Sequence, residues 1–68
     1  MKIKVNGIEI ANIITNKSMT IEEAMYAAGY DINSSEDCRK CYEEGIEGFY
    51  LSDNGDYQFD FEAAEMIY

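Results

Sequence analysis

Two cysteines three positions apart, Cys38 and Cys41, form the one short motif in the chain with a chemical precedent. Two thiols at this spacing can bind a metal ion or cycle between dithiol and disulfide. A structural zinc site needs four ligands, whereas the chain has no third cysteine and no histidine. On a helix the same spacing places both sulfurs on one face, where free cysteine behaves as a small hydrophobic residue. We therefore expect two core cysteines and no resident metal or cofactor, with redox cycling or a metal site shared between molecules as alternatives.

The segment Asp53-Asn54-Gly55-Asp56 contains the residue types of a calcium-binding loop. An EF-hand that starts at Asp53 needs oxygen ligands at its fifth and twelfth positions and glycine at its sixth. The fifth, sixth and twelfth positions hold Tyr57, Gln58 and Ala64. A hairpin turn accounts for the segment instead, because Asn-Gly readily adopts the positive φ angles of a two-residue turn.

The chain has 14 acidic residues, so some carboxylates must lie close together, which is the minimum for general acid–base chemistry. Catalysis also needs a cleft that perturbs their pKa values, and 68 residues leave little volume for one. There is no histidine, and Arg39 is the single arginine available to bind an anionic substrate. We therefore expect a protein that is not an enzyme and whose carboxylates form a solvated acidic surface.

The acidic residues are concentrated in the second half of the chain. The net charge is -9 at pH 7, and residues 35–68 hold ten acids against Arg39 and Lys40. Tyrosines are frequent in the same half; they are enriched at interfaces, while acidic side chains steer association with a basic partner. Solubility alone is the alternative explanation of the charge. The candidate partner-binding residues are Glu43, Glu44, Glu47, Tyr50, Asp53, Asp56, Tyr57, Asp60, Glu62 and Glu65.

The charge and hydropathy also indicate what kind of partner to expect. A net charge of -9 repels phosphate and anionic lipid, so we expect no direct nucleic-acid binding and no membrane binding. Apolar stretches are far shorter than the roughly 20 residues that span a bilayer. No leader pattern is seen, so we expect a cytoplasmic protein. The expected partner is a basic protein, such as a nuclease or another nucleic-acid-binding protein, with a homodimer as a further possibility.

In size, acidity and lack of catalytic residues, the chain resembles the small acidic proteins that phages and mobile elements use against host nucleases, anti-CRISPR proteins among them. The resemblance covers the whole length, rests on overall character and carries over no individual residue. It implies an inhibitor that occupies the basic, nucleic-acid-binding surface of its target as a nucleic-acid mimic, with carboxylates in place of phosphates. The alternative is a self-associating or adaptor protein-interaction module with no connection to nucleic acid.

A β-hairpin is expected at the start of the chain, with strands at 2–5 and 8–14. Asn6-Gly7 between them is typical of a type I′ turn. Pairing across this turn sets Lys4 opposite Glu9. The alternation then places four apolar residues together on the other face, namely Ile3, Val5, Ile8 and Ile10.

Two helices are expected to follow. Thr20-Ile21-Glu22-Glu23 is a capping box, so a short helix begins there, and Gly29 is placed to end it. Ser34 or Ser35 begins a second helix that runs to about Glu44. Its inner face is expected to hold Cys38, Cys41 and Tyr42.

A second hairpin and a short final helix complete the expected fold. Residues 49–52 and 57–61 flank the turn at Asn54-Gly55, and the alternation places Tyr50, Tyr57, Phe59 and Phe61 on one face. Residues 62–68 are rich in good helix formers and could form a helix capped by Asp60. The sequence therefore predicts a small α+β domain over residues 1–68, with two β-hairpins and two or three short helices.

Overall fold

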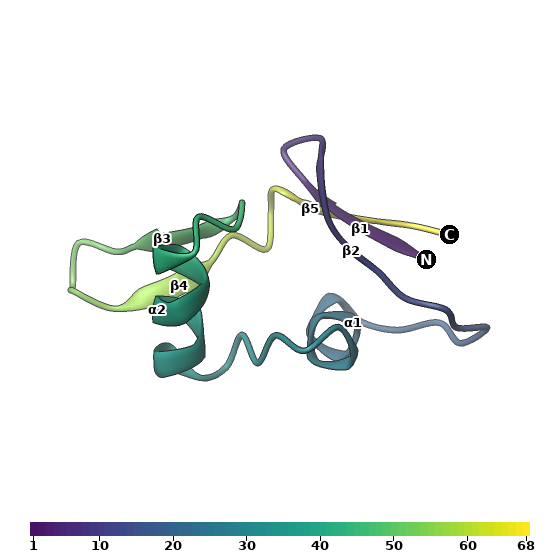
Figure 1. Cartoon of the computed structure of the whole chain (residues 1–68), viewed down its shortest axis with the longest axis horizontal. Coiled ribbons are helices and arrows are strands. Elements are labelled where there is room, and N and C mark those ends of the chain that lie inside the picture. The colour runs from purple at the N-terminus through teal and green to yellow at the C-terminus, as the bar shows by residue number, and fades with distance from the viewer.

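The computed structural model describes all 68 residues and contains two helices and five strands in two separate antiparallel sheets (Figure 1). The predicted α+β class is therefore confirmed. The two hairpins do not join into one sheet: one sheet has the strand order β2-β1-β5 and the other pairs β3 with β4. The elements in chain order are β1 (Lys2–Val5), β2 (Ile8–Asn12), α1 (Ile21–Ala27), α2 (Ser35–Glu43), β3 (Phe49–Leu51), β4 (Tyr57–Phe59) and β5 (Ala64–Ile67).

The first hairpin forms at the predicted turn, but its register changes after two pairs. Asn6 and Gly7 have φ angles of 51° and 80°, as a type I′ turn requires. Lys4 lies opposite Glu9 as predicted, whereas Ile3, the residue before it, pairs with Ala11, so that β2 carries a one-residue bulge. Ile8 lies opposite Val5, as the predicted apolar face requires, although it is 52% exposed. The prediction is wrong for Ile10, because the bulge places Ala11 opposite Ile3 in its stead.

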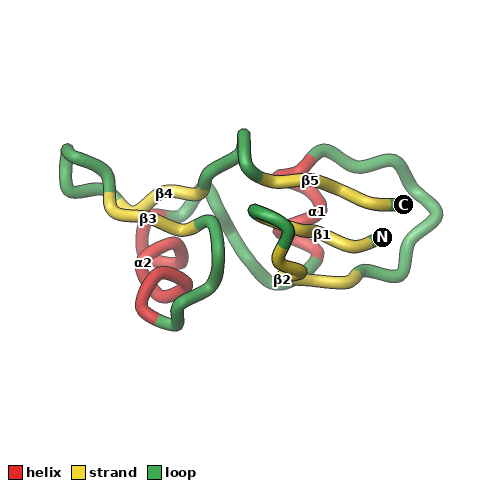
Figure 2. The backbone as a smooth tube through the Cα atoms, turned by 90° about the horizontal axis from the view of Figure 1, so that it is seen from above, coloured by secondary structure: helices red, strands yellow, loops and turns green.

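The prediction of a helix at the end of the chain is wrong, because residues 64–67 form strand β5. It pairs antiparallel with β1 along its whole length, which makes β1 the central strand of the three (Figure 2). Asp60 does act as a cap, since its Oδ1 accepts a hydrogen bond from the Ala63 backbone N–H at 3.2 Å. No helix follows this cap because an isolated helix of seven residues is unstable, whereas the unpaired edge of β1 offers backbone hydrogen bonds to alternate residues of an added strand.

Both predicted helices form, with the predicted caps. The Thr20 hydroxyl accepts from the Glu23 N–H at 3.2 Å, and the Glu23 carboxylate accepts from the Thr20 N–H at 3.0 Å. The Ser34 side chain caps α2 in the same way, by accepting from the Asp37 N–H at 3.3 Å. Neither helix has the length and apolar character that are needed to cross a membrane.

The inner face of α2 is narrower than predicted. Cys38 and Cys41 are buried on it, but Tyr42 is 44% exposed and lies against Tyr57 of β4, with ring centroids 5.4 Å apart. The prediction that Tyr42 belongs to the buried face is therefore wrong. Its ring covers the end of the two-stranded sheet instead.

The second hairpin has a three-residue loop in place of the predicted two-residue turn. The Ser52 N–H donates to the Asp56 carbonyl at 2.8 Å, and only Gly55 of the Asn-Gly pair has a positive φ angle, at 87°. This geometry is typical of three-residue hairpin loops, in which a tight turn is followed by a glycine that forms a β-bulge. The longer loop shifts the pairing register of the two strands by one residue, and such a shift moves a side chain to the other face of the sheet. Tyr50 therefore lies opposite Gln58, and the prediction that it shares a face with Tyr57 is wrong.

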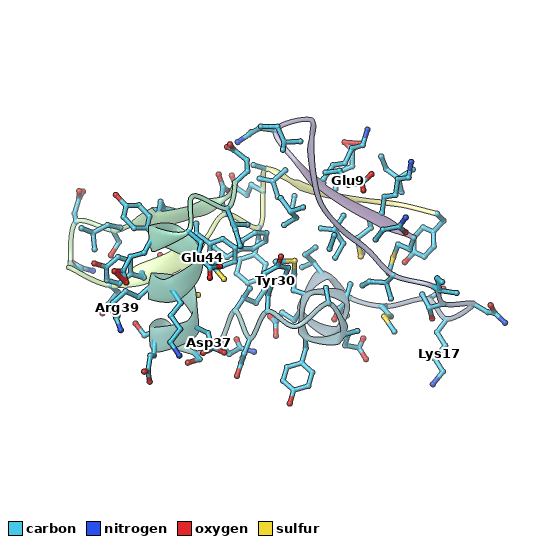
Figure 3. All side chains as sticks on the ribbon, viewed as in Figure 1. Glu9, Lys17, Tyr30, Asp37, Arg39 and Glu44 are labelled. Carbon is cyan, nitrogen blue, oxygen red and sulfur yellow. The ribbon has the colours of Figure 1, made fainter.

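One hydrophobic cluster runs through both sheets and joins them. Tyr30 lies between the two halves of the molecule (Figure 3), with its ring centroid 6.3 Å from that of Phe49. Phe49 in turn packs against Phe59 at 4.9 Å. The buried members of the cluster are Ile3, Val5, Ala24, Met25, Ile32, Cys38, Cys41, Phe49 and Phe59.

Candidate partner-binding groove

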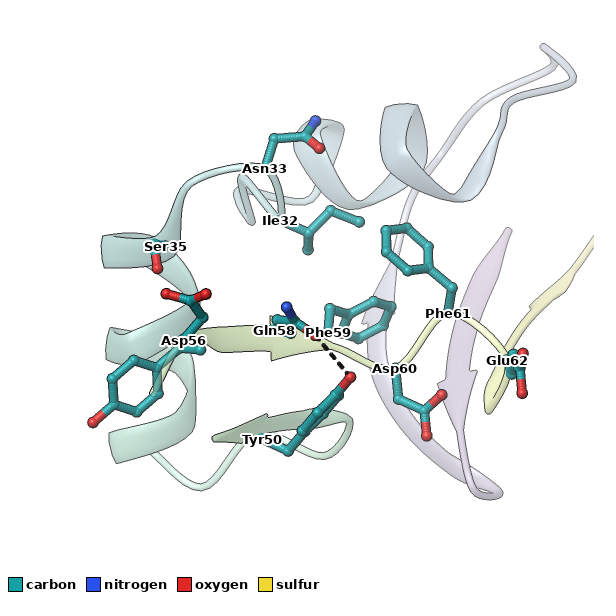
Figure 4. A pocket seen from close by; sticks show the side chains of 11 residues that line it. Ile32, Asn33, Ser35, Tyr50, Asp56, Gln58, Phe59, Asp60, Phe61 and Glu62 are labelled. Carbon is teal, nitrogen blue, oxygen red and sulfur yellow. Dashed lines mark hydrogen bonds between the residues drawn. The ribbon is translucent and has the colours of Figure 1, made fainter. Parts of the chain in front are cut away.

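A groove of about 1040 Å³ runs along β4 (Figure 4), and we refer to it as the β4 groove. One wall is a continuous stretch of chain, residues 56–62, which includes the whole of β4. The facing wall comes from the segment that leads into α2. The complete lining is Ile32, Asn33, Ser35, Tyr50, Asp56, Tyr57, Gln58, Phe59, Asp60, Phe61 and Glu62.

Local capping interactions hold the facing wall in place. The Asn33 N–H donates to Asp31 Oδ1 at 3.1 Å, in a turn that precedes the helix. The Asn33 side chain donates to Glu22 of α1 at 3.4 Å, and Ser34 then caps α2. Ile32 is buried in the core. The wall is therefore tied to both helices and to the core.

Three carboxylates give the β4 groove its charge. Asp56 and Glu62 are exposed at its two ends, and Asp60 is half-buried between them. No lysine or arginine lines the groove, so these charges are not neutralised within it. Like charges on one wall of a groove focus a negative potential there and attract cations.

Aromatic side chains lie beside these carboxylates. Tyr50 is 43% exposed, and its hydroxyl donates to Gln58 Oε1 at 3.0 Å (Figure 4). Phe61 is 44% exposed and packs edge-on against Phe59, at a centroid distance of 5.7 Å. The groove thus offers a partner both apolar contact area and negative charge, a combination typical of protein interfaces.

Half of the ten predicted binding residues line the groove. These five are Tyr50, Asp56, Tyr57, Asp60 and Glu62. Asp53 lies outside the lining, in the exposed loop between β3 and β4. Glu44 is also exposed, at the C-cap of α2.

The other three predicted residues lie outside the groove, beside other neighbours. Glu43 forms a 2.8 Å ion pair with Arg39 one helical turn earlier. Glu47 accepts a 3.0 Å hydrogen bond from the Asn6 side chain, and Glu65 lies opposite Lys4 in the three-stranded sheet. The structure does not bring these carboxylates into the β4 groove.

Sequence reasoning missed the apolar part of the groove and its facing wall. The alternation of residues 57–61 could have pointed to Phe59 and Phe61 as residues beside the acids. No sequence signal places Ile32, Asn33 or Ser35 there, because they meet β4 only through the packing of α2 on the two-stranded sheet.

The two cysteines lie apart from this groove lining, in the core. Both are free thiols, and Cys38 Sγ donates to the Ile32 carbonyl at 3.5 Å. Burial raises the pKa of both thiols, and a neighbouring carboxylate adds to the effect, Asp31 for Cys38 and Glu44 for Cys41. A raised pKa disfavours the thiolate that metal binding and thiol exchange require. Nowhere in the chain do three or more His, Cys, Asp or Glu side chains form a group that could hold a metal ion.

Comparison of the chain with models of known protein families, with curated proteins and with solved structures gave no match. The shape, charge and hydrogen bonding of the β4 groove are therefore the features from which a function is inferred.

Proposed function

We propose that the protein is an inhibitor that binds a basic, nucleic-acid-binding surface of a partner protein in the cytoplasm and thereby keeps nucleic acid away from it. The observation that carries this proposal is the β4 groove, in which three carboxylates lie beside exposed aromatic rings and no cationic side chain is present. Surfaces that hold nucleic acid are rich in lysine and arginine, so they are complementary to such a groove.

In the proposed complex, the carboxylates of Asp56, Asp60 and Glu62 take the places of phosphates. Tyr50 and Phe61 supply contact area where bases or sugars would lie. The net charge of -9 attracts a basic partner over a distance of about one Debye length, so it raises the association rate. Asp53 in the hairpin loop extends the same negative surface beyond the groove.

We propose a binding role and no catalytic one. Asp56 and Glu62 are exposed to solvent. Catalytic carboxylates, in contrast, are usually placed in an enclosed cleft that shifts their pKa values. The open groove therefore supports binding to a large partner surface.

The proposal is tested by affinity capture with a variant that reverses charge at the groove. The tagged protein is incubated with a nuclease-treated bacterial lysate, washed in steps of rising salt and eluted with added DNA or RNA. The test variant carries Asp53→Lys, Asp56→Lys and Glu62→Lys; Asp60 is kept because its carboxylate caps the turn at Ala63. The control variant carries three lysines at exposed acids outside the groove lining, Glu9, Glu36 and Glu44, so both variants have the same net charge.

We expect the wild type and the control variant to capture a nucleic-acid-binding protein that salt and added nucleic acid release. The groove variant is expected to lose that partner while circular dichroism shows an unchanged fold. Equal loss in both variants would show that only net charge matters. Capture that resists added nucleic acid would exclude competition for a shared surface.

A second candidate function is self-association, and uncovered strand edges favour it. β2 and β5 are the outer strands of the three-stranded sheet, and Ile8 and Ile67 on them are exposed. Unpaired edges of this kind can join two copies of a chain. A dimer held by apolar contacts would persist at high salt, whereas the proposed charge-based complex would dissociate.

A further inference from the structure

The hydrogen-bond pattern of the two-stranded sheet shows which backbone groups of β4 face outward. The Asp60 N–H donates to the Gly48 carbonyl at 2.8 Å, and the Ser52 N–H donates to the Asp56 carbonyl at 2.8 Å. In an antiparallel pair, residues that bond to the partner strand alternate with residues whose N–H and C=O point away from it. The register therefore directs the backbone groups of Tyr57 and Phe59 away from β3.

These outward groups lie along the β4 groove. β3 pairs with one side of β4 only, and the wall that holds Ile32, Asn33 and Ser35 lies across the groove from the other side (Figure 4). None of the hydrogen bonds outside the regular helices and strands involves the backbone of Tyr57 or Phe59. An unpaired strand edge that borders a groove is the arrangement to which an extended peptide adds as a further strand.

We infer that β4 binds an extended basic segment of the partner as an added strand in the β4 groove. This inference rests on the proposed function, because it takes the partner to be a basic protein. The backbone of Tyr57 and Phe59 supplies hydrogen bonds that do not depend on the sequence of the segment. The three carboxylates of the groove select for positive charge.

The groove also specifies the side chains of the segment. Successive side chains of an added strand point to opposite faces of the sheet. On one face they lie beside Phe59, Phe61 and Ile32, which favours apolar residues. On the other face they lie beside Gln58, and long cationic side chains reach Asp56 and Asp60 at the two ends of β4. The matching segment alternates basic and apolar residues.

Charge argues against a second copy of this chain as the occupant. Antiparallel pairing of two β4 strands would bring Asp56 of one copy towards Asp60 and Glu62 of the other. Like charges across a strand pair destabilise it. A basic segment removes that repulsion and replaces it with attraction.

The test is amide hydrogen exchange, followed by NMR on the full chain, with a short synthetic peptide of alternating lysine and valine as the probe. We expect the amides of Tyr57 and Phe59 to exchange at least about tenfold more slowly when the peptide is bound. The amide of Gln58 should change little, because it already bonds to β3. A peptide of alternating glutamate and valine is the control, and it should not bind.

Two variants at Tyr57 separate the contribution of its backbone N–H to peptide binding from the contribution of its side chain. Tyr57→Pro removes the outward N–H and leaves the bonds to β3 in place, which an edge strand tolerates. Tyr57→Ala removes the ring and keeps the N–H. We expect Tyr57→Pro to bind the peptide at least about tenfold more weakly than Tyr57→Ala does. The Gln58 amide in each variant reports whether the hairpin is intact.

The outcomes separate this inference from the proposed function. Binding of the lysine peptide without slower exchange at Tyr57 and Phe59 would overturn strand addition and leave a basic partner standing. The lysine peptide could also fail to bind while the intact protein still captures a basic partner that nucleic acid displaces. That result would likewise overturn strand addition and leave the proposed function standing. Slower exchange at these two amides in the free protein as its concentration rises would show that a second copy occupies the edge, which also overturns the inference.

Discussion

A Cβ atom on Gly48 would lie 2.9 Å from Cγ1 of Val5, and equally close to the ring of Phe59. Gly48 therefore brings the backbone before β3 directly against a buried side chain of β1, at the point where the two sheets meet. Its φ angle of +98° is one that residues with side chains rarely adopt. The contact between the sheets depends on the absence of a side chain here.

Gly48→Ala should destabilise the protein by about 2–4 kcal/mol, because it adds overpacking to backbone strain. Gly45→Ala is the matched control, since Gly45 also has a positive φ angle, +77°, but a methyl group added there would meet no other atom within 4 Å. It should cost only about 1 kcal/mol. Urea unfolding of both variants measures the difference, and equal losses would contradict the role of packing.

Short-range features of the fold could be predicted from the sequence. The capping box at Thr20, the cap at Ser34 and the turn at Asn6-Gly7 all form as expected. Each depends on interactions between residues at most a few positions apart, so the local sequence contains the information that decides it.

Features that depend on distant partners could not be predicted in the same way. Residues 64–67 have the composition of a helix, but they form β5 because β1, at the other end of the chain, offers them hydrogen bonds. The second hairpin shows a related limit. Asn54-Gly55 fits a two-residue turn and a three-residue loop equally well, and the choice decides which face Tyr50 occupies.

The candidate site was predictable in its charge and not in its geometry. The excess of acids in residues 35–68 follows from counting. Which acids stay free depends on tertiary neighbours: Asn6 engages Glu47, and Lys4 lies opposite Glu65. Both of these neighbours come from the first hairpin, far away in the sequence.

Removal of the Thr20 hydroxyl should weaken α1. Thr20→Ala loses the cap to the Glu23 N–H and should lower the free energy of unfolding by about 1 kcal/mol. Thr20→Ser keeps the hydroxyl and should stay close to the wild type. Thermal or urea unfolding checks this, and a loss in the serine variant as large as in the alanine variant would rule out the capping bond as the cause.

The capping box should also be visible in the titration of Glu23. Hydrogen bonds from Thr20, first from its backbone N–H and then from its hydroxyl, lower the pKa of this carboxyl. Because the pKa is lower in the folded state, the stabilisation is present above the unfolded value of about 4.3 and is lost as the pH falls through the folded value. An NMR titration should place the pKa of Glu23 below the ordinary glutamate value of about 4.3 in the wild type and closer to that value in Thr20→Ala. Identical titration of Glu23 in both proteins would contradict the role of the hydroxyl.

The buried thiols should make the protein less stable in alkali. Burial raises the pKa of Cys38 and Cys41, so both stay protonated in the folded state at a pH where the unfolded chain ionises. Their contribution is fully present below the unfolded value of about 8.5 and is lost as the pH rises through the folded values. The free energy of unfolding should therefore begin to fall near this pH, and the fall should be smaller in a variant with Cys38→Ala and Cys41→Ala.

The same thiols should react with a thiol reagent only when the protein opens. Cys38 is 1% exposed and Cys41 is 7% exposed, so a reagent has almost no access to either sulfur in the folded state. At pH 8, labelling should be at least about a hundredfold slower than in denaturant, because it requires local or global unfolding. Gly48→Ala should accelerate it by about tenfold for each 1.4 kcal/mol of stability lost, since a larger fraction of molecules is then open. Labelling of the native protein as fast as that of the unfolded chain would instead place the two thiols at the surface, within reach of the redox or metal chemistry that their spacing allows.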